Sequence, residues 1–255
     1  MSIYVCVKHV PDSAATITIR DGRQIDETIT FLLNPYDENA VEAAVRQKAQ
    51  ETDAEVVAVT LGKAGAENTL RSALAMGADR GLHILTAERQ DSMVTARALA
   101  AAIRQDGVAD IIFTGKAAID SEGWETQYRL AAVLDLPVVS NVTELSREGQ
   151  ALTVVWEGDA GALQTLKVPL PCVIGASKAL NRPRYPTLPD IIKARKKKIR
   201  TVDLAALDLG RPAGVLELLD LQPAVENRRA KILAGSPEVA VDELVRLLRE
   251  EAKVI

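Results

Sequence analysis

The chain has 255 residues, of which 47% are hydrophobic and 26% are charged, a composition typical of a globular protein. Aromatic residues make up only 3%, which disfavours a nucleic-acid platform of stacking rings, and no apolar run approaches the roughly 18–20 residues of a membrane span. The net charge of −4 is uneven, because residues 190–200 hold six Lys or Arg and one acid, a local +5 that leaves −9 elsewhere.

Short apolar runs alternate with longer, Ala-rich stretches over the first 180 residues. Several runs are apolar throughout rather than at every second position, which is typical of strands buried on both faces of a parallel sheet. We therefore expect strands at residues 3–7, 55–61, 81–85, 111–114, 152–156 and 172–175.

The Ala-rich stretches predict helices at residues 37–50, 64–76, 90–106 and 124–134. Asn34-Pro35 precedes the first helix and Asp91-Ser92 opens the third, and both pairs are helix-start signals. The alternation of strands and helices predicts an α/β fold in which helices flank a doubly wound, mostly parallel sheet, a Rossmann-like arrangement.

Two segments depart from this alternation. Asp21-Gly22 lies between two β-branched runs and predicts a hairpin turn. Residues 181–190 contain three prolines, so we expect an ordered or partner-bound loop there rather than a helix, followed by the basic run.

An extended C-terminal arm is expected after residue 200. An amphipathic helix is predicted at residues 239–252. The arm packs either on its own domain, which composition slightly favours, or on another chain. Turn signals precede the helix at Gly210, Pro212, Gly214, Pro223 and residues 235–237.

Residues suited to catalysis are scarce. The chain has two histidines and no GxSxG, HExxH, P-loop or GxGxxG motif. His83 lies inside an apolar run, which favours a structural role, whereas His9 follows the first strand, where a ligand contact and a plain loop residue are equally open. Cys6 and Cys172 form no CxxC, so we expect neither a zinc site nor a disulfide. This cysteine usage, and a start without the basic region and cleavage site of a secretory signal, fit a cytoplasmic location.

Three of the expected strands end in small or polar residues, at 7–12 (VKHVPD), 60–65 (TLGKAG) and 114–121 (TGKAAIDS). The carboxyl ends of parallel strands lie side by side, and the helix N-termini that follow offer N–H groups to phosphate. Gly62 and Gly115 permit close backbone approach. The pattern predicts a nucleotide site made of turns, although glycines also occur in such turns for structural reasons alone.

Taken together, five segments resemble the beta subunit of electron transfer flavoprotein. The resemblance runs from residue 1 to about residue 200 and extends less clearly to the end. Its most specific part is the last segment, which combines a Pro-rich loop with the basic run. The segments are VCVKHVPD (5–12), LNPYDENAVEAAVRQK (33–48), LRSALAMGADRG (70–81), GKAAID (115–120) and NRPRYPTLPDIIKARKKKI (181–199).

The resemblance implies one half of an alpha–beta heterodimer that carries electrons, rather than a stand-alone enzyme. The alpha subunit would hold a redox-active FAD, and the beta subunit would hold AMP and help to cover that FAD. Acyl-CoA dehydrogenases would dock on the beta subunit, and a quinone-linked oxidoreductase is one candidate acceptor. We expect no nucleic-acid partner, since the pI is about 5.4 and no reading motif is present, and no membrane insertion.

The resemblance also implies two sets of residues and no catalytic or metal-binding residue. Residues 1–200 would form the nucleotide-binding domain, and residues 201–255 would pack on the alpha subunit. The nucleotide would be bound by Val7, Lys8, His9, Asn34, Thr60, Gly62, Gly115, Lys116, Ala117, Asp120, Ser121, Glu122 and Thr126. The partner would dock on the recognition loop at 181–199, where Leu188 inserts, with Tyr185, Pro189, Ile192, Lys193, Arg195, Lys196 and Lys197 around it. On composition alone the basic run is a solvated surface, whereas with the resemblance it steers acidic partners.

One loop departs from the family pattern. After GKAAID the chain continues SEGWETQYRLA (121–131), where AMP-binding members commonly carry NQTG and electron-bifurcating members commonly carry GDTAQVGP. Trp124 replaces the Asn, either packing into an interface or stacking on a ring. Glu125 disfavours a nearby phosphate unless it points away or binds a sugar hydroxyl or a cation. AMP is favoured, and two alternatives stay open: a bifurcating subunit whose second FAD oxidises NADH, and a non-redox AMP-binding module.

Overall fold

The computed structural model describes residues 1–51, 53–210, 214, 216–222 and 230–255. Their contacts divide them into two units, Met1–Asp220 and Leu221–Ile255, each of which is described by itself. The predicted turn signals at Pro212 and Pro223 lie outside the described residues. A functional boundary at residue 200 stays a prediction.

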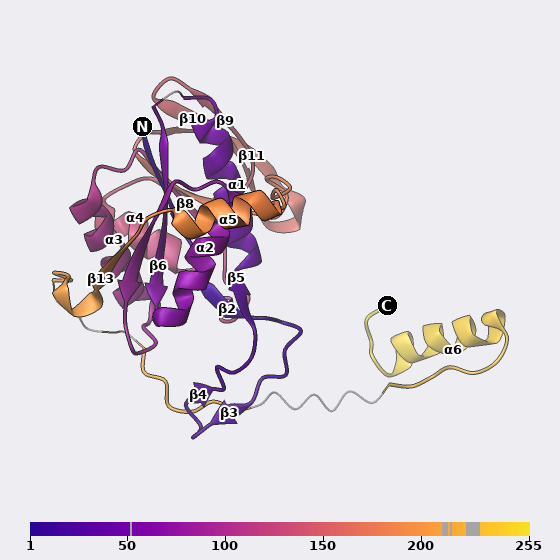
Figure 1. Cartoon of the computed structure of the whole chain (residues 1–255). Coiled ribbons are helices and arrows are strands. Elements are labelled where there is room, and N and C mark those ends of the chain that lie inside the picture. The colour runs from indigo at the N-terminus through magenta and orange to yellow at the C-terminus, as the bar shows by residue number, and fades with distance from the viewer. Residues whose placement is uncertain (52, 211–213, 215, 223–229) are drawn as a thin grey trace. The chain divides into compact units, whose positions relative to one another are not determined.

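A nine-stranded sheet forms the centre of the first unit, in the order β11-β10-β9-β12-β8-β1-β6-β7-β13 (Figure 1). Each neighbouring pair from β9 to β13 is parallel, and β10 is antiparallel to both β9 and β11. The predicted doubly wound, mostly parallel sheet is therefore confirmed. The strands are Ser2–Cys6 (β1), Glu55–Gly62 (β6), Arg80–Leu85 (β7), Ile111–Gly115 (β8), Val138–Glu148 (β9), Ala151–Glu157 (β10), Leu163–Pro169 (β11), Cys172–Ala176 (β12) and Ile199–Asp203 (β13).

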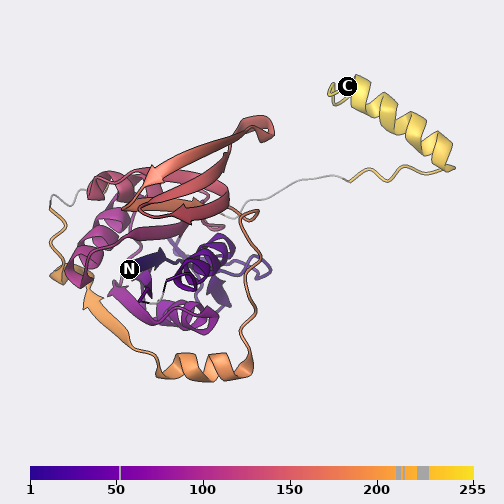
Figure 2. The same cartoon turned by 90° about the horizontal axis from the view of Figure 1, so that it is seen from above.

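Helices cover both faces of the sheet (Figure 2). One buried cluster joins side chains of α1 and α2 with Ala194 of α5, and the other joins side chains of α3 and α4. The helices of the first unit are α1 (Pro35–Lys48), α2 (Glu67–Met76), α3 (Ser92–Asp106), α4 (Thr126–Leu134) and α5 (Leu188–Lys196), with short 3₁₀ turns η1 (Ala64–Ala66), η2 (Asp159–Gly161) and η3 (Leu204–Ala206).

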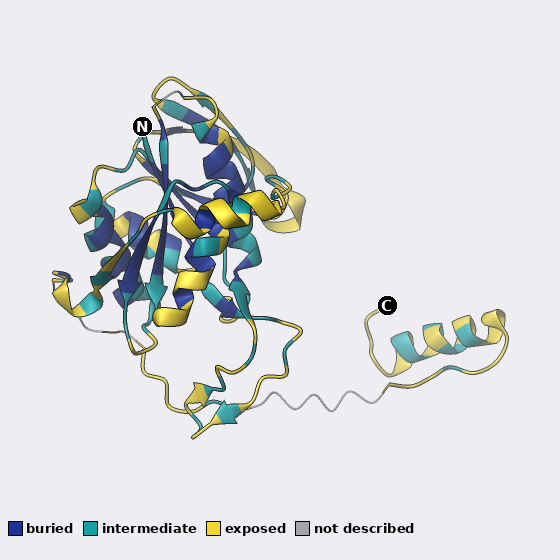
Figure 3. Cartoon of the chain, in the orientation of Figure 1, coloured by how far each residue is buried: buried dark blue, intermediate teal, exposed yellow. Residues whose placement is uncertain are grey.

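The central strands supply both clusters at once. In β1, Ile3 and Val5 belong to the α1–α2 cluster, whereas Tyr4 and Cys6 belong to the α3–α4 cluster. Successive strand side chains point to opposite faces, so a strand covered on both sides is apolar at every position. Figure 3 shows these strands buried along most of their length.

The order of the strands places a topological switch point beside β1, and we call the sheet edge at the carboxyl ends of β1 and β8 the β1–β8 crevice. The chain proceeds from β1 to β6 and β7 on one side, and then crosses to β8 on the other side. The connections after β1 and β8 therefore leave the sheet in opposite directions, and ligands of open α/β sheets bind at such switch points, beyond the carboxyl ends of the strands.

Five strands were not predicted, because each is either only three residues long or carries polar residues within its run. Strand β9 alternates apolar residues with Thr, Glu, Ser and Arg, which is the pattern of a strand buried on one face. Strands β11 and β13 are the exposed edges of the sheet. The pair β2 (His9–Pro11) and β5 (Phe31–Leu33) encloses the predicted hairpin, which is confirmed as β3 (Ile19–Arg20) and β4 (Gln24–Ile25).

The prediction of a loop throughout residues 181–190 was wrong in its last three residues. Helix α5 begins at Leu188, because Thr187 and Asp190 form a capping box in which each side chain accepts a hydrogen bond from the other's backbone N–H. Pro189 is tolerated there, since the first helical residues need no intrahelical N–H donor. Residues 181–187 have no helix or strand, as expected.

The second unit contains helix α6 (Pro237–Glu250), close to the predicted 239–252. Val239, Val241 and Leu244 on this helix are exposed.

Candidate functional site

The structure brings most of the predicted nucleotide-site residues to the crevice between β1 and β8. Asn34 precedes α1, and Gly115 ends β8. The side chain of Asn34 is buried and donates to the carbonyl of Ala117 at 2.9 Å, while the backbone N–H of Ile119 donates to its Oδ1 at 3.2 Å. Asn34 thus fixes the loop that follows β8.

A buried carboxylate joins the two strands at this crevice. Asp37, on the first turn of α1, accepts the backbone N–H of Lys8 at 2.7 Å and that of Gly115 at 3.0 Å. Burial raises the pKa of Asp37 to about 7, although hydrogen bonds from Asn34, Lys8 and Gly115 favour its charged form. Asp37 was not predicted, since nothing in the sequence signals which strand ends its carboxylate would join.

Lys8 connects the end of β1 to the far side of the same loop. Its ammonium donates to Asp120 Oδ1 at 2.6 Å and to Ser121 Oγ at 3.3 Å. Glu122 follows with a φ of 46°, in the left-handed region that residues other than glycine adopt rarely. Residues 117–122 therefore form a fixed turn beside the crevice.

Gln127 binds both ends of the loop at residues 116–124. This buried side chain donates to the carbonyl of Lys116 at 3.0 Å, to that of Trp124 at 3.3 Å and to Ser140 Oγ at 2.8 Å. A Cβ at Gly175 would overlap Gln127 Oε1, so the glycine provides the space for this side chain. In the sequence Gln127 stands only within the loop that departs from the family pattern, at residues 121–131.

Trp124 and Glu125, which differ from the family pattern, have distinct surroundings. Trp124 is 43% exposed, has a φ of 54°, and its ring lies 4.8 Å from the ammonium of Lys116. This backbone angle delays the start of α4 from the expected residue 124 to Thr126. Glu125 pairs with Arg129 at 2.8 Å and accepts from Ser92 at 2.9 Å, and it makes no side-chain cap on α4.

The first turn of α4 can accept an anion. No side chain of its N-cap residue occupies the backbone N–H groups there, and such groups favour phosphate. Lys116 adds positive charge at the same edge; its ammonium is 3.0 Å from Asn141 Oδ1 and 5.6 Å from the ring centroid of Tyr36. This edge therefore offers an ammonium group and backbone N–H donors.

Three predicted residues at the strand ends have packing partners. Thr60 Oγ1 donates to the carbonyl of Val7 at 2.7 Å and ties β6 to β1. The carbonyl of Gly62 lies 3.1 Å from His83 Nε2. His9 Nδ1 is 2.7 Å from Thr69 Oγ1, its ring stacks on Phe31, and burial lowers its pKa.

The predicted docking residues lie on a segment that we define as residues 181–197, the docking segment. Tyr185 is 97% exposed and Leu188 is 70% exposed, and Ile191 and Ile192 are exposed on the same helix. Of the cations, Lys193, Arg195 and Lys196 are exposed. The ammonium of Lys197 instead donates to two carbonyls at the end of α2, so it differs from the others in its surroundings.

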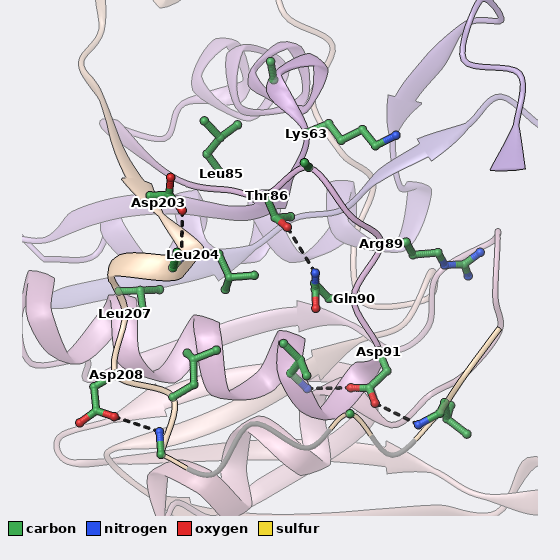
Figure 4. Close-up of a pocket in the computed structure, with 18 residues that line it drawn as sticks. Lys63, Leu85, Thr86, Arg89, Gln90, Asp91, Asp203, Leu204, Leu207 and Asp208 are labelled. Carbon is green, nitrogen blue, oxygen red and sulfur yellow. Dashed lines mark hydrogen bonds between the residues drawn. The ribbon is translucent and has the colours of Figure 1, made fainter. Parts of the chain in front are cut away.

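A separate hollow of about 1090 Å³ lies beyond the ends of β7 and β13 (Figure 4). Its walls combine apolar residues with Lys63, Arg89, Asp91 and other polar groups, and Asp91 also caps α3. None of the predicted site residues lines it. The hollow is therefore distinct from the β1–β8 crevice.

Two other kinds of feature are absent from the part of the chain that the structure describes. No group of three or more His, Cys, Asp or Glu there is arranged to hold a metal ion. No helix there is both long enough and apolar enough to cross a bilayer. Burial raises the pKa of the Cys6 thiol to about 12, which makes it a poor nucleophile.

Comparison with known proteins identifies the family. Residues 23–207 match the family described as electron transfer flavoprotein domain. The chain is 36% identical over 254 residues to "Electron transfer flavoprotein subunit beta" of Syntrophomonas wolfei, covering 100% of this chain and 98% of that protein. It belongs to the electron transfer flavoprotein beta-subunit family.

Further relatives agree. The beta subunit of Bacillus subtilis is 34% identical over 259 residues, with 100% of both chains covered. The human beta subunit is 40% identical over 208 residues, with 79% of this chain and 81% of that protein covered. The expected resemblance is therefore confirmed.

Proposed function

We propose that this chain pairs with an alpha subunit as the beta half of an electron transfer flavoprotein. In this proposal the alpha subunit holds a redox-active FAD, and this chain binds AMP and helps to cover that FAD. Acyl-CoA dehydrogenases dock on this chain, and the heterodimer, located in the cytoplasm, passes electrons on to a respiratory acceptor. Membership of the beta-subunit family supports the pairing.

The observation that carries the nucleotide proposal is the arrangement at the β1–β8 crevice. Lys8, the turn at 117–122 and the first turn of α4 surround one strand edge, and they offer an ammonium group, backbone donors and carboxylates. Glu125 pairs with Arg129 on its own helix, which answers the objection that its charge would repel a phosphate. The bound nucleotide would be held by contacts from three elements distant in sequence.

The proposed docking surface rests on the exposed apolar residues of α5 and the cations around them. Tyr185, Leu188 and Ile192 are large apolar side chains in water, and such patches commonly mark partner surfaces. The neighbouring cations would attract an acidic partner and speed its encounter. The exposed face of α6 supports a second contact, to the alpha subunit, through Val241 and Leu244.

Ligand analysis of the purified heterodimer tests the nucleotide proposal. The chain is co-expressed with its alpha subunit, the complex is denatured, and the released nucleotides are identified by mass and quantified. One FAD and one AMP per heterodimer are expected. Two FAD would overturn the AMP assignment and favour the electron-bifurcating alternative, and a flavin-free chain that fails to pair would favour an AMP-binding module.

Leu188→Ala tests the docking proposal. Removing most of the side chain that would insert into the dehydrogenase should slow flavin reduction by an acyl-CoA dehydrogenase. Flavin and nucleotide content should stay at the wild-type level, because Leu188 is exposed and its truncation removes little packing. Unchanged reduction kinetics would contradict the docking role.

A further inference from the structure

The start of the docking segment is bound to helix α1. Asn39 Nδ2 donates to the carbonyl of Asn181 at 2.9 Å, and Asn181 Nδ2 donates back to the carbonyl of Asn39 at 2.9 Å. Glu42, whose side chain is 4% exposed, accepts Arg184 Nε at 2.7 Å and the backbone N–H of Arg184 at 3.2 Å. We call these contacts the N-terminal tether.

The charge pair in this tether is well stabilised. Burial alone would raise the pKa of Glu42, but hydrogen bonds from Arg184 and Arg46 outweigh it and lower that pKa. The same contact raises the pKa of Arg184. Near neutral pH the tether therefore joins two ionised groups, one of them almost fully buried, and charge-assisted hydrogen bonds of this kind are the stronger ones.

The end of the docking segment is bound to helix α2 by two cations that cap each other's helices. Arg71 on α2 donates to the carbonyls of Ala194 at 3.0 Å and Lys197 at 2.8 Å, at the end of α5. Lys197 donates to the carbonyls of Leu74 at 2.9 Å and Ala78 at 2.6 Å, at the end of α2. The last carbonyls of a helix lack intrahelical donors, so each cation satisfies acceptors of the other helix. We call these contacts the C-terminal tether.

The part of the docking segment between the two tethers buries little of its surface against the rest of the unit. Ala194 is the only residue of α5 that is buried, whereas Leu188, Ile191 and Ile192 are exposed. Hydrophobic burial therefore contributes little to holding this helix in place. Its position depends on the polar contacts at its two ends and on the prolines at 183 and 186, which restrict the chain before it.

We propose that Glu42 and Arg71 are positioning residues for partner docking, which hold the docking segment in one conformation before the dehydrogenase arrives. This inference rests on the docking role proposed above. A segment that is already ordered loses less conformational entropy on binding, so its affinity for a partner is higher. Lys197 then acts in positioning rather than in contact with the partner, and the exposed cations Lys193, Arg195 and Lys196 are left for the encounter.

Arg71→Gln and Glu42→Gln, each in the heterodimer, test the proposal by two measurements. Hydrogen–deuterium exchange should rise in residues 188–197 for Arg71→Gln and in residues 181–187 for Glu42→Gln. The KM for an acyl-CoA dehydrogenase as electron donor should rise by about tenfold, equivalent to about 1.4 kcal/mol, while kcat stays within about twofold. Flavin and nucleotide content should not change.

Glu67→Gln is the matched control. Glu67 pairs with Arg71 within α2 at 2.8 Å, so the variant removes an ion pair from the same guanidinium and leaves its contacts to α5. It should show wild-type exchange and KM. Arg71→Lys keeps one donor and should recover part of the lost affinity; it serves as the readout if Arg71→Gln fails to assemble.

The outcomes separate this inference from the docking role itself. If Leu188→Ala raises KM but both tether variants keep wild-type exchange and KM, the positioning role is overturned and docking stands. If Leu188→Ala has no effect, the docking role fails. Increased exchange in a tether variant without a change in KM would also overturn the inference, because the order of the segment would then not contribute to affinity.

Discussion

Gly115 and Asp37 touch across 78 residues of sequence, with the backbone nitrogen of Gly115 3.0 Å from Asp37 Oδ1. A Cβ at position 115 would overlap that oxygen and would lie 2.7 Å from the Cβ of Tyr36 and 2.8 Å from its carbonyl carbon. The glycine is thus what allows the start of α1 to approach the end of β8. The crevice depends on this close approach.

Gly115→Ala should therefore disturb the crevice. Its Cβ meets backbone and a buried carboxylate, neither of which can move freely, so the free energy of unfolding should fall by about 1–3 kcal/mol. The nucleotide content of the purified heterodimer should fall as well. Gly123→Ala is the control, because a Cβ there meets nothing within 4 Å. Equal stability and nucleotide content in the two variants would contradict the close-approach argument.

Asp37 should make stability depend on pH between about 4 and 7. Its folded pKa is raised to about 7 from 3.8, so the folded state binds this proton more tightly than the unfolded state does. The resulting stabilisation is fully present below the unfolded pKa and is lost as the pH rises through about 7, by up to about 4 kcal/mol.

Asp37→Asn removes this titration. Relative to the wild type, the variant should therefore gain stability as the pH is raised from 5 to 8, although it loses one of the two accepted backbone hydrogen bonds. Urea unfolding at pH 5, 6.5 and 8 measures the difference. A difference that stays constant over this range would show that Asp37 does not titrate there.

The parts of the fold that the sequence predicts are those whose signal is local. The central parallel strands are apolar runs, and α3 begins after Asp91, whose Oδ1 accepts the N–H of Val94. The capping box of Thr187 and Asp190 is also local, but the density of prolines concealed it. Strand β9 has a polar face and therefore no continuous apolar run, so its sequence did not predict a buried strand.

The site was predicted only in part for a different reason. The strand ends that line the crevice follow from the parallel sheet, and so do Lys8, Asn34 and Gly115. The contacts that fix their geometry join residues far apart, as Asp37 joins Gly115 and Arg71 joins Ala194. One sequence shows that such residues are polar, but not which backbone groups they will meet.

Gln127→Met should loosen the loop between β8 and α4. Methionine keeps a similar volume beside Gly175 but donates nothing to the carbonyls of Lys116 and Trp124. Leaving these groups without donors should lower the free energy of unfolding by about 1–3 kcal/mol and speed nucleotide release. Tyr128→Phe, at the exposed neighbouring position, should do neither. Nucleotide retention during dialysis measures the effect, and equal retention in both variants would remove Gln127 from the site.

The exposed cations of the docking segment should govern the rate at which a dehydrogenase associates with the heterodimer. Lys193→Glu reverses one charge on the face beside Ile192, so kcat/KM for flavin reduction by an acidic dehydrogenase should fall by up to about tenfold at low ionic strength. The deficit should shrink as salt is added, because exposed charges are screened beyond about 10 Å at 0.1 M. Lys167→Glu makes the same charge change on the exposed strand β11, away from α5, and should leave the rate near that of the wild type. Stopped-flow measurement of flavin reduction at several salt concentrations gives the salt dependence of the rate for each variant. If the two variants lose rate equally, the net charge of the chain rather than the docking segment directs the encounter.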